Sequence, residues 1–185
     1  ALNLALIMSH LACASEPEHA MNKAQRDAFA QAAATLPYAP LSLANSGGSL
    51  LGIDYCFDMI RPGIGLYGGG PFDAVAVPLR PVAHLTAPIL AVRDVGPGDS
   101  VGYGATWQAT RHRKIATVGL GYADGFLRSG SSRGFGILGG AVCPIVGRVS
   151  MDLIGLDVTG AGKAAVEGAT VEFLGPAAPI DAQAQ

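Results

Sequence analysis

Residues 4–10 read LALIMSH, an apolar run that ends in a serine and a histidine. A run of this length is typical of a buried parallel strand. Residues 18–35 come next and predict a helix, which Pro37 ends. A second apolar run follows at residues 41–44. The apolar residues at helical spacing are Met21, Ala24, Ala28, Phe29 and Ala32. Strand, helix and strand in this order predict a βα-barrel or a doubly wound α/β sheet.

The pattern changes from about residue 75, where short runs rich in valine, isoleucine, leucine and threonine alternate with glycine turns. This punctuation predicts an all-β barrel or sandwich. The expected strands are residues 82–92, 114–120, 136–149 and 154–158. Prolines between residues 71 and 81 place a boundary near 72–80, so we expect domains at 1–75 and 76–185. A full βα-barrel takes about 250 residues, so the first part supplies only two or three βα units.

Composition excludes several classes of protein. The chain has 185 residues, of which 50% are hydrophobic and 14% charged, with a net charge of −2. It can therefore bury a core, and it lacks the basic surface that binds nucleic acid or anionic membranes. No apolar run is long enough to span a membrane. Three cysteines in apolar surroundings favour a reducing, cytoplasmic compartment. No cysteine or histidine spacing indicates a metal site.

Polar residues follow three successive strand ends in the first part. Residues 8–12 (MSHLA) place His10 there, residues 44–48 (ANSGG) place Ser46, and residues 61–68 (RPGIGLYG) place Arg61 before a glycine-rich turn. Ligands of barrels and open α/β sheets bind at the carboxyl ends of strands. A cation, a hydroxyl and exposed amides suit a phosphate attached to a polar ring. Taken singly, such residues are more often a core histidine, a turn serine and a surface arginine.

Three motifs in the second part add to this pattern: residues 101–106 (VGYGAT), 121–128 (GYADGFLR) and 147–152 (GRVSMD). In order and approximate spacing, the motifs of both parts resemble the alanine racemase family from about residue 4 to residue 175. The resemblance implies the C-terminal part of a TIM-like barrel that binds pyridoxal 5'-phosphate (PLP), followed by a β-barrel-like domain. It also implies interconversion of L- and D-alanine by proton transfer between two bases on opposite faces of the substrate.

The resemblance assigns roles to individual residues. Tyr103 matches one of the two catalytic bases, His10 the histidine that contacts that tyrosine, and Arg61 the arginine that donates to the pyridine nitrogen. The implied cofactor-binding residues are His10, Ser46, Arg61, Gly63 and Ile64, the last two through backbone amides. The implied substrate-binding residues are Tyr103, Tyr122, Met151 and Asp152. Without the resemblance, a strand-end aromatic, a tight turn and a core methionine would account for these motifs.

The chain also departs from the family pattern. No segment matches the motif of the PLP lysine, and Lys23, Lys114 and Lys163 are the only lysines. A family arginine about one βα unit before His10 and a C-terminal tyrosine that contacts the phosphate are also missing. We therefore expect a fragment that holds one of the two bases and is inactive alone. The resemblance further implies a homodimer, alanine as substrate, and D-alanine supply for peptidoglycan.

Two other interpretations stay open at this stage. One is a broad-specificity or serine racemase of the same family. The other is a non-catalytic β-domain interaction module with a remnant of α/β structure. Tyr103 together with His10 and Arg61 discriminates against the module, which has no need for all three.

Overall fold

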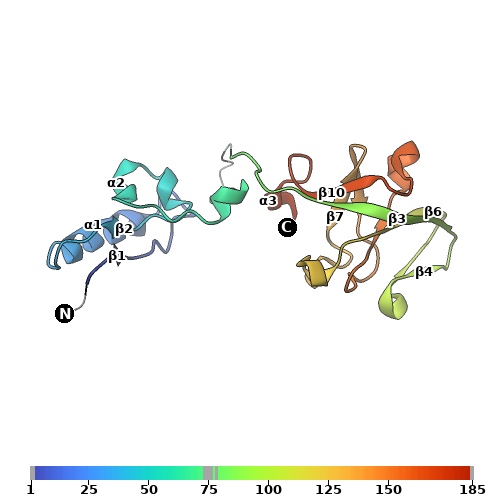
Figure 1. Ribbon diagram of the computed structural model, residues 1–185, viewed down its shortest axis with the longest axis horizontal. Coiled ribbons are helices and arrows are strands. Elements are labelled where there is room, and N and C mark those ends of the chain that lie inside the picture. The colour runs from blue at the N-terminus through green and yellow to red at the C-terminus, as the bar shows by residue number, and fades with distance from the viewer. Residues whose placement is uncertain (1–2, 73–76, 78, 184–185) are drawn as a thin grey trace. The chain divides into compact units, whose positions relative to one another are not determined.

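The computed structural model describes residues 3–72, 77 and 79–183. The chain divides into two compact units, a first unit at Ala1–Val82 and a second at Ala83–Gln185 (Figure 1). The boundary that the sequence predicts between residues 75 and 76 lies outside the described residues.

The first unit alternates strands and helices. Strand β1 (Ile7–Met8) is followed by helix α1 (Ala20–Ala33) and strand β2 (Leu41–Ser42), and β1 pairs in parallel with β2. A 3-10 helix at Gly48–Leu50, helix α2 (Ile53–Cys56) and a second 3-10 helix at Ile64–Tyr67 complete it. The predicted order of strand, helix and strand is confirmed, although both strands are shorter than the apolar runs that predicted them.

The buried face of α1 differs from the predicted apolar stripe. Its buried residues are Asn22, Phe29 and Ala33, whereas Met21 is exposed. Asn22 is buried because its side-chain amide donates to the carbonyls of Glu16 and Pro17 in the loop before the helix. The stripe prediction was therefore wrong except for Phe29, because the helix binds this loop with a polar side chain. The core of the unit consists of Leu11, Ala14, Phe29 and Leu43.

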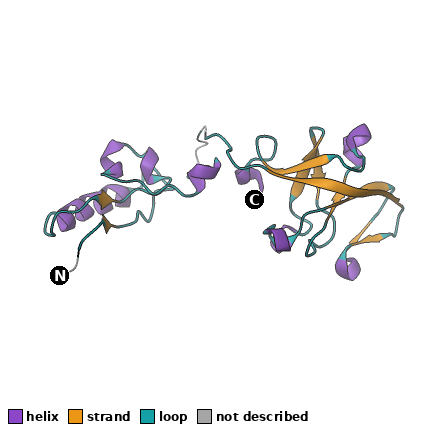
Figure 2. Cartoon of the chain, viewed as in Figure 1, coloured by secondary structure: helices purple, strands orange, loops and turns teal. Residues whose placement is uncertain are grey.

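The second unit is mostly β structure (Figure 2). Its main strands are β3 (Leu85–Val95), β6 (Arg113–Val118), β7 (Phe135–Leu138), β8 (Ala141–Pro144), β9 (Ile154–Asp157) and β10 (Thr170–Leu174). They form one antiparallel sheet in the order β8-β7-β10-β3-β6-β9. A bridge between Ile145, next to β8, and Leu156 of β9 nearly closes the sheet into a barrel. The all-β prediction for this part is confirmed.

Smaller elements complete the second unit. Strands β4 (Ser100–Val101) and β5 (Trp107–Gln108) form a separate antiparallel pair, and helix α3 spans Ile180–Gln183. The predicted strand at 136–149 is instead the β7–β8 hairpin, which turns at Gly139 and Gly140 with positive φ angles of 57° and 83°. Phe173 of β10 packs edge-on against Phe126 at a centroid distance of 5.5 Å.

Cys143 on β8 differs from the other two cysteines. It has 0% exposure, whereas Cys13 and Cys56 are half-buried, and all three are free thiols. Burial and then the nearby charge of Asp157 raise the pKa of the Cys143 thiol above its ordinary value of 9.0, and a hydrogen bond from the Leu138 backbone opposes them. Ionisation is therefore easier in the unfolded chain. The stability that this thiol contributes is present below pH 9 and is lost as the pH rises through the raised pKa.

We expect a thiol reagent at pH 8 to modify Cys13 and Cys56 in the native protein and Cys143 only after unfolding, because the thiolate is the reactive species. Mass spectrometry of native and denatured samples checks this. The Cys143→Ala variant should give the same number of labels in both states. Labelling of Cys143 under native conditions would contradict the buried position.

Candidate functional site

A cavity of about 550 Å³ in the first unit lies past the ends of β1 and β2. It brings together all five residues that the sequence analysis assigned to the cofactor: His10, Ser46, Arg61, Gly63 and Ile64. Its volume is within the range of about 300–1,000 Å³ typical of small-molecule sites. The parallel pairing of β1 with β2 explains the convergence of His10 and Ser46, because the residues after both strands emerge at the same edge. The third strand end that the sequence predicted before Arg61 is not a strand: Met59 forms only an isolated parallel bridge with Ser42, and this bridge brings Arg61 to the same edge.

Arg61 is the most firmly held of these residues. Its Nη2 donates to the Ser9 carbonyl at 2.6 Å, its Nη1 donates to the Ser42 hydroxyl oxygen, and its backbone amide donates to the Ala44 carbonyl at 2.8 Å. Nη2 also lies 3.5 Å from His10 Nδ1. The guanidinium therefore has a fixed orientation beside the His10 ring at the edge of the cavity.

Ser46 organises the glycine-rich turn. Its hydroxyl oxygen accepts the Gly63 amide at 2.8 Å and the Gly65 amide at 3.1 Å. The hydroxyl proton remains to be donated, which suits an anion. The Gly63 amide, which the sequence analysis assigned to the phosphate, is thus engaged with Ser46, and a direct contact to an anion would require that bond to open. The described residues offer no hydrogen-bond partner to the Ile64 amide, which lines the cavity.

His10 is exposed and is held by neighbours that the sequence analysis missed. Asn45 Nδ2 lies 3.2 Å from His10 Nε2, and Asn45 Oδ1 accepts the Gly48 amide at 2.9 Å. Gln25 of α1 accepts the Ala12 amide at 2.9 Å and donates to the His10 carbonyl at 3.4 Å. No local pattern in the sequence marks Gln25, because its contacts with residues 10 and 12 depend on how α1 packs against the preceding loop.

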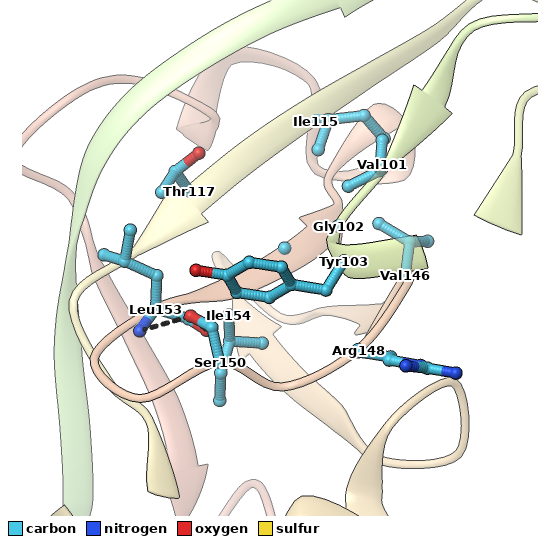
Figure 3. A pocket seen from close by; sticks show the side chains of 11 residues that line it. Val101, Gly102, Tyr103, Ile115, Thr117, Val146, Arg148, Ser150, Leu153 and Ile154 are labelled. Atoms are coloured by element: carbon cyan, nitrogen blue, oxygen red, sulfur yellow. Dashed lines mark hydrogen bonds between the residues drawn. The ribbon is translucent and has the colours of Figure 1, made fainter. Parts of the chain in front are cut away.

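The second unit carries Tyr103 in a cavity of about 380 Å³. Tyr103 begins a short 3-10 segment, Tyr103–Ala105, between β4 and β5, and is 71% exposed. Figure 3 shows its hydroxyl end on the side of Leu153 and Ser150, away from Arg148. The turn can lie this close to Gly147 only because that residue lacks a side chain: a Cβ there would lie 2.5 Å from the Val101 carbonyl oxygen.

The structure brings Tyr122, Met151 and Asp152 together on neighbouring loops of the same unit. The Tyr122 amide donates to the Ser150 carbonyl at 3.0 Å, and the Ala123 amide donates to the Met151 carbonyl at 2.9 Å. A Cβ on Gly121 would lie 2.1 Å from the Met151 carbonyl oxygen, so only glycine allows this contact. The three side chains are exposed. This backbone pairing also places them next to Ser150, which lines the Tyr103 cavity.

The two clusters offer different chemistry. The cavity of the first unit presents a hydroxyl, an amide and a guanidinium, a set that can hold an anionic group joined to a polar ring. The cavity of the second unit presents a phenol hydroxyl that makes no hydrogen bond to another described residue, so it is available to hydrogen-bond a ligand. Within residues 3–72, 77 and 79–183, no three histidine, cysteine, aspartate or glutamate residues gather as a metal site would require. No described helix combines the length and apolar character of a membrane span.

Comparisons with known proteins agree with this division. The family described as "Alanine racemase, N-terminal domain" matches residues 1–71, and "Alanine racemase, C-terminal domain" matches residues 82–185. An alanine racemase from Rhodospirillum rubrum is 51% identical over 180 residues, which cover 97% of this chain and 48% of the relative. One from a Ruegeria species is 54% identical over 159 residues, or 85% of this chain and 44% of the relative.

A solved structure shows the same fold. The alanine racemase of Bartonella henselae, solved with covalently bound pyridoxal phosphate, has a TM-score of 0.86 and 40% identity and covers 97% of this chain and 50% of its own. The chain spans about half the length of these relatives.

Proposed function

The chain belongs to the alanine racemase family, with a TIM-barrel part and a C-terminal β domain, and from this premise we propose that the complete protein interconverts L- and D-alanine with PLP as its cofactor. The observation that carries the proposal is the single cavity shared by His10, Ser46, Arg61, Gly63 and Ile64.

The residues of the cavity fit PLP chemically. The Ser46 hydroxyl and the Ile64 amide would hold the phosphate, and Arg61 would face the pyridine nitrogen. When bound, PLP withdraws electrons from the α-carbon of the amino acid. A guanidinium donates hydrogen bonds but does not release its proton, so Arg61 would leave the ring nitrogen unprotonated. This limits electron withdrawal and disfavours side reactions such as transamination.

Tyr103 would act as one of the two bases and move the proton at the α-carbon on its face of the substrate. Tyr122, Met151 and Asp152 would contact the substrate, because their backbone segments pair beside Ser150, which lines the Tyr103 cavity. We also propose a cytoplasmic homodimer in which Tyr103 of one subunit serves the cofactor cavity of the other. The support for this arrangement is the family resemblance and the high exposure of Tyr103.

The test is racemisation by the complete protein with PLP, followed by chiral chromatography of L- and D-alanine, with serine as the competing substrate. We expect alanine to be racemised in both directions and serine more slowly. A polypeptide of these 185 residues alone should racemise neither, because no segment of it matches the PLP lysine motif. Failure of the complete protein to racemise alanine, or a preference for serine, would overturn the assignment.

A further inference from the structure

Ser42 lies behind the cofactor cavity and takes no part in the functions assigned so far. It is the last residue of β2 and has 0% exposure. Its hydroxyl donates to the Met59 carbonyl at 2.8 Å, and its oxygen accepts Nη1 of Arg61. A hydroxyl has one proton, so the bond to Met59 leaves only lone pairs to face Arg61. The direction of the Ser42–Arg61 contact is therefore fixed.

The second anchor of the guanidinium is tied to the first. Arg61 Nη2 donates to the Ser9 carbonyl at 2.6 Å, and the Ser9 amide donates to the Ser42 carbonyl at 3.1 Å. Ser42 and Met59 are also joined by a parallel β-bridge. The two acceptors of Arg61 therefore lie on neighbouring segments whose backbones are hydrogen-bonded to each other. Together they hold both terminal nitrogens of the guanidinium.

We infer that Ser42 is a positioning residue that fixes the Arg61 guanidinium for its hydrogen bond to the ring nitrogen of PLP. This inference rests on the proposed function. Arg61 lines the cavity and Ser42 does not, so Ser42 acts through Arg61 without touching the cofactor. Ser42 and Ser9 occupy two of the five guanidinium N–H groups, which leaves the other donors available to the cavity side. Without Ser42, Nη1 loses its acceptor and the guanidinium can rotate.

The experiment titrates the complete apoprotein with PLP and with a PLP analogue whose ring nitrogen is replaced by C–H. We expect Ser42→Ala to raise the Kd for PLP by about 5- to 20-fold. A change of this size corresponds to weakening one charge-assisted hydrogen bond, here the bond from Arg61 to the ring nitrogen. The Kd for the analogue should change by less than about twofold. Ser42→Cys fills the same space with a weak acceptor and should shift the PLP affinity in the same direction. The control is Thr35→Ala, which removes a hydroxyl that donates to the Ala32 carbonyl at 2.8 Å and should change neither Kd.

The pattern across ligands separates the explanations. An equal loss of affinity for both ligands would show that Ser42 only supports the fold, and unchanged PLP affinity would show that it does not position Arg61. Arg61→Ala serves as the reference and should abolish the preference for PLP over the analogue. If Arg61→Ala abolishes that preference and both Ser42 variants keep it, the inference about Ser42 fails alone. If Arg61→Ala keeps the preference, the proposed contact of Arg61 with the ring fails and the inference about Ser42 fails with it.

Discussion

Replacement of Tyr103 by phenylalanine in the complete protein should lower alanine racemisation by about 10²- to 10⁴-fold, the usual loss when a general base is removed. Phenylalanine keeps the ring that lines the cavity and removes only the hydroxyl. Tyr103 is 71% exposed, and its hydroxyl makes no hydrogen bond to another described residue. The substitution therefore leaves no buried group without a partner, and stability should change little. The loss of rate would then report on proton transfer.

The measurement that isolates this step is exchange of the α-proton with deuterated solvent, followed separately for L- and D-alanine. A base on the opposite face should still exchange the proton of its own enantiomer, so one exchange rate should persist while the other collapses. Near wild-type exchange on both enantiomers would remove Tyr103 from the mechanism and leave it a packing residue.

Mixed dimers test whether Tyr103 acts across subunits. Tyr103→Phe and Arg61→Ala subunits would be combined, since each variant is expected to lose most of its activity as a homodimer. If Tyr103 serves the partner's cavity, the heterodimer has one site with both defects and one intact site, so activity returns. If Tyr103 serves its own subunit, every site carries one defect and no activity returns. The second result would contradict the proposed arrangement.

The first-unit site could be predicted from local sequence. His10 and Ser46 each follow a short apolar run that contains a strand, and parallel pairing of β1 with β2 brings such positions to one edge. The local pattern therefore predicted where a ligand could bind, whereas the assignment of His10, Ser46 and Arg61 to a cofactor came from the family resemblance. The local pattern also predicted the β character of the second unit, where the turn residues are glycine and proline.

The residues that hold the site could not be predicted in the same way. Ser42 contacts Arg61 across 19 positions in the chain, and Gln25 contacts His10 across 15. These partners depend on the register of β2 and on the angle of α1, which nearby residues do not determine. The predicted buried face of α1 was wrong for a related reason. Asn22 is buried because its side chain hydrogen-bonds the preceding loop, and the spacing of apolar residues cannot predict the burial of a polar side chain.

Two ion pairs that involve adjacent residues of β6 provide the second large prediction, which concerns stability. The exposed pair serves as the control for the buried one. Asp157 of β9 is 8% exposed and accepts Arg113 Nη1 at 2.9 Å, the Thr159 amide at 3.0 Å and the Thr159 hydroxyl at 2.6 Å. The next residue, Lys114, pairs at 3.1 Å with Asp94, whose side chain is 81% exposed. In both pairs a cation of β6 contacts an aspartate of a neighbouring strand, and the two pairs differ mainly in burial.

Asp157→Ala should therefore lower the free energy of unfolding by about 3 kcal/mol, because it leaves a largely buried guanidinium and the Thr159 amide without their acceptor. Asp94→Ala should cost at most about 1 kcal/mol, since solvent screens the exposed pair. Urea unfolding of the complete protein, followed by circular dichroism, measures the free energy of unfolding of both variants. The comparison is valid when the variants have the same m-value. The Arg113→Met, Asp157→Leu double variant should recover much of the loss, because apolar replacement of a buried pair removes both desolvation penalties. Equal costs for Asp157→Ala and Asp94→Ala would show that burial of the Arg113–Asp157 pair does not strengthen it.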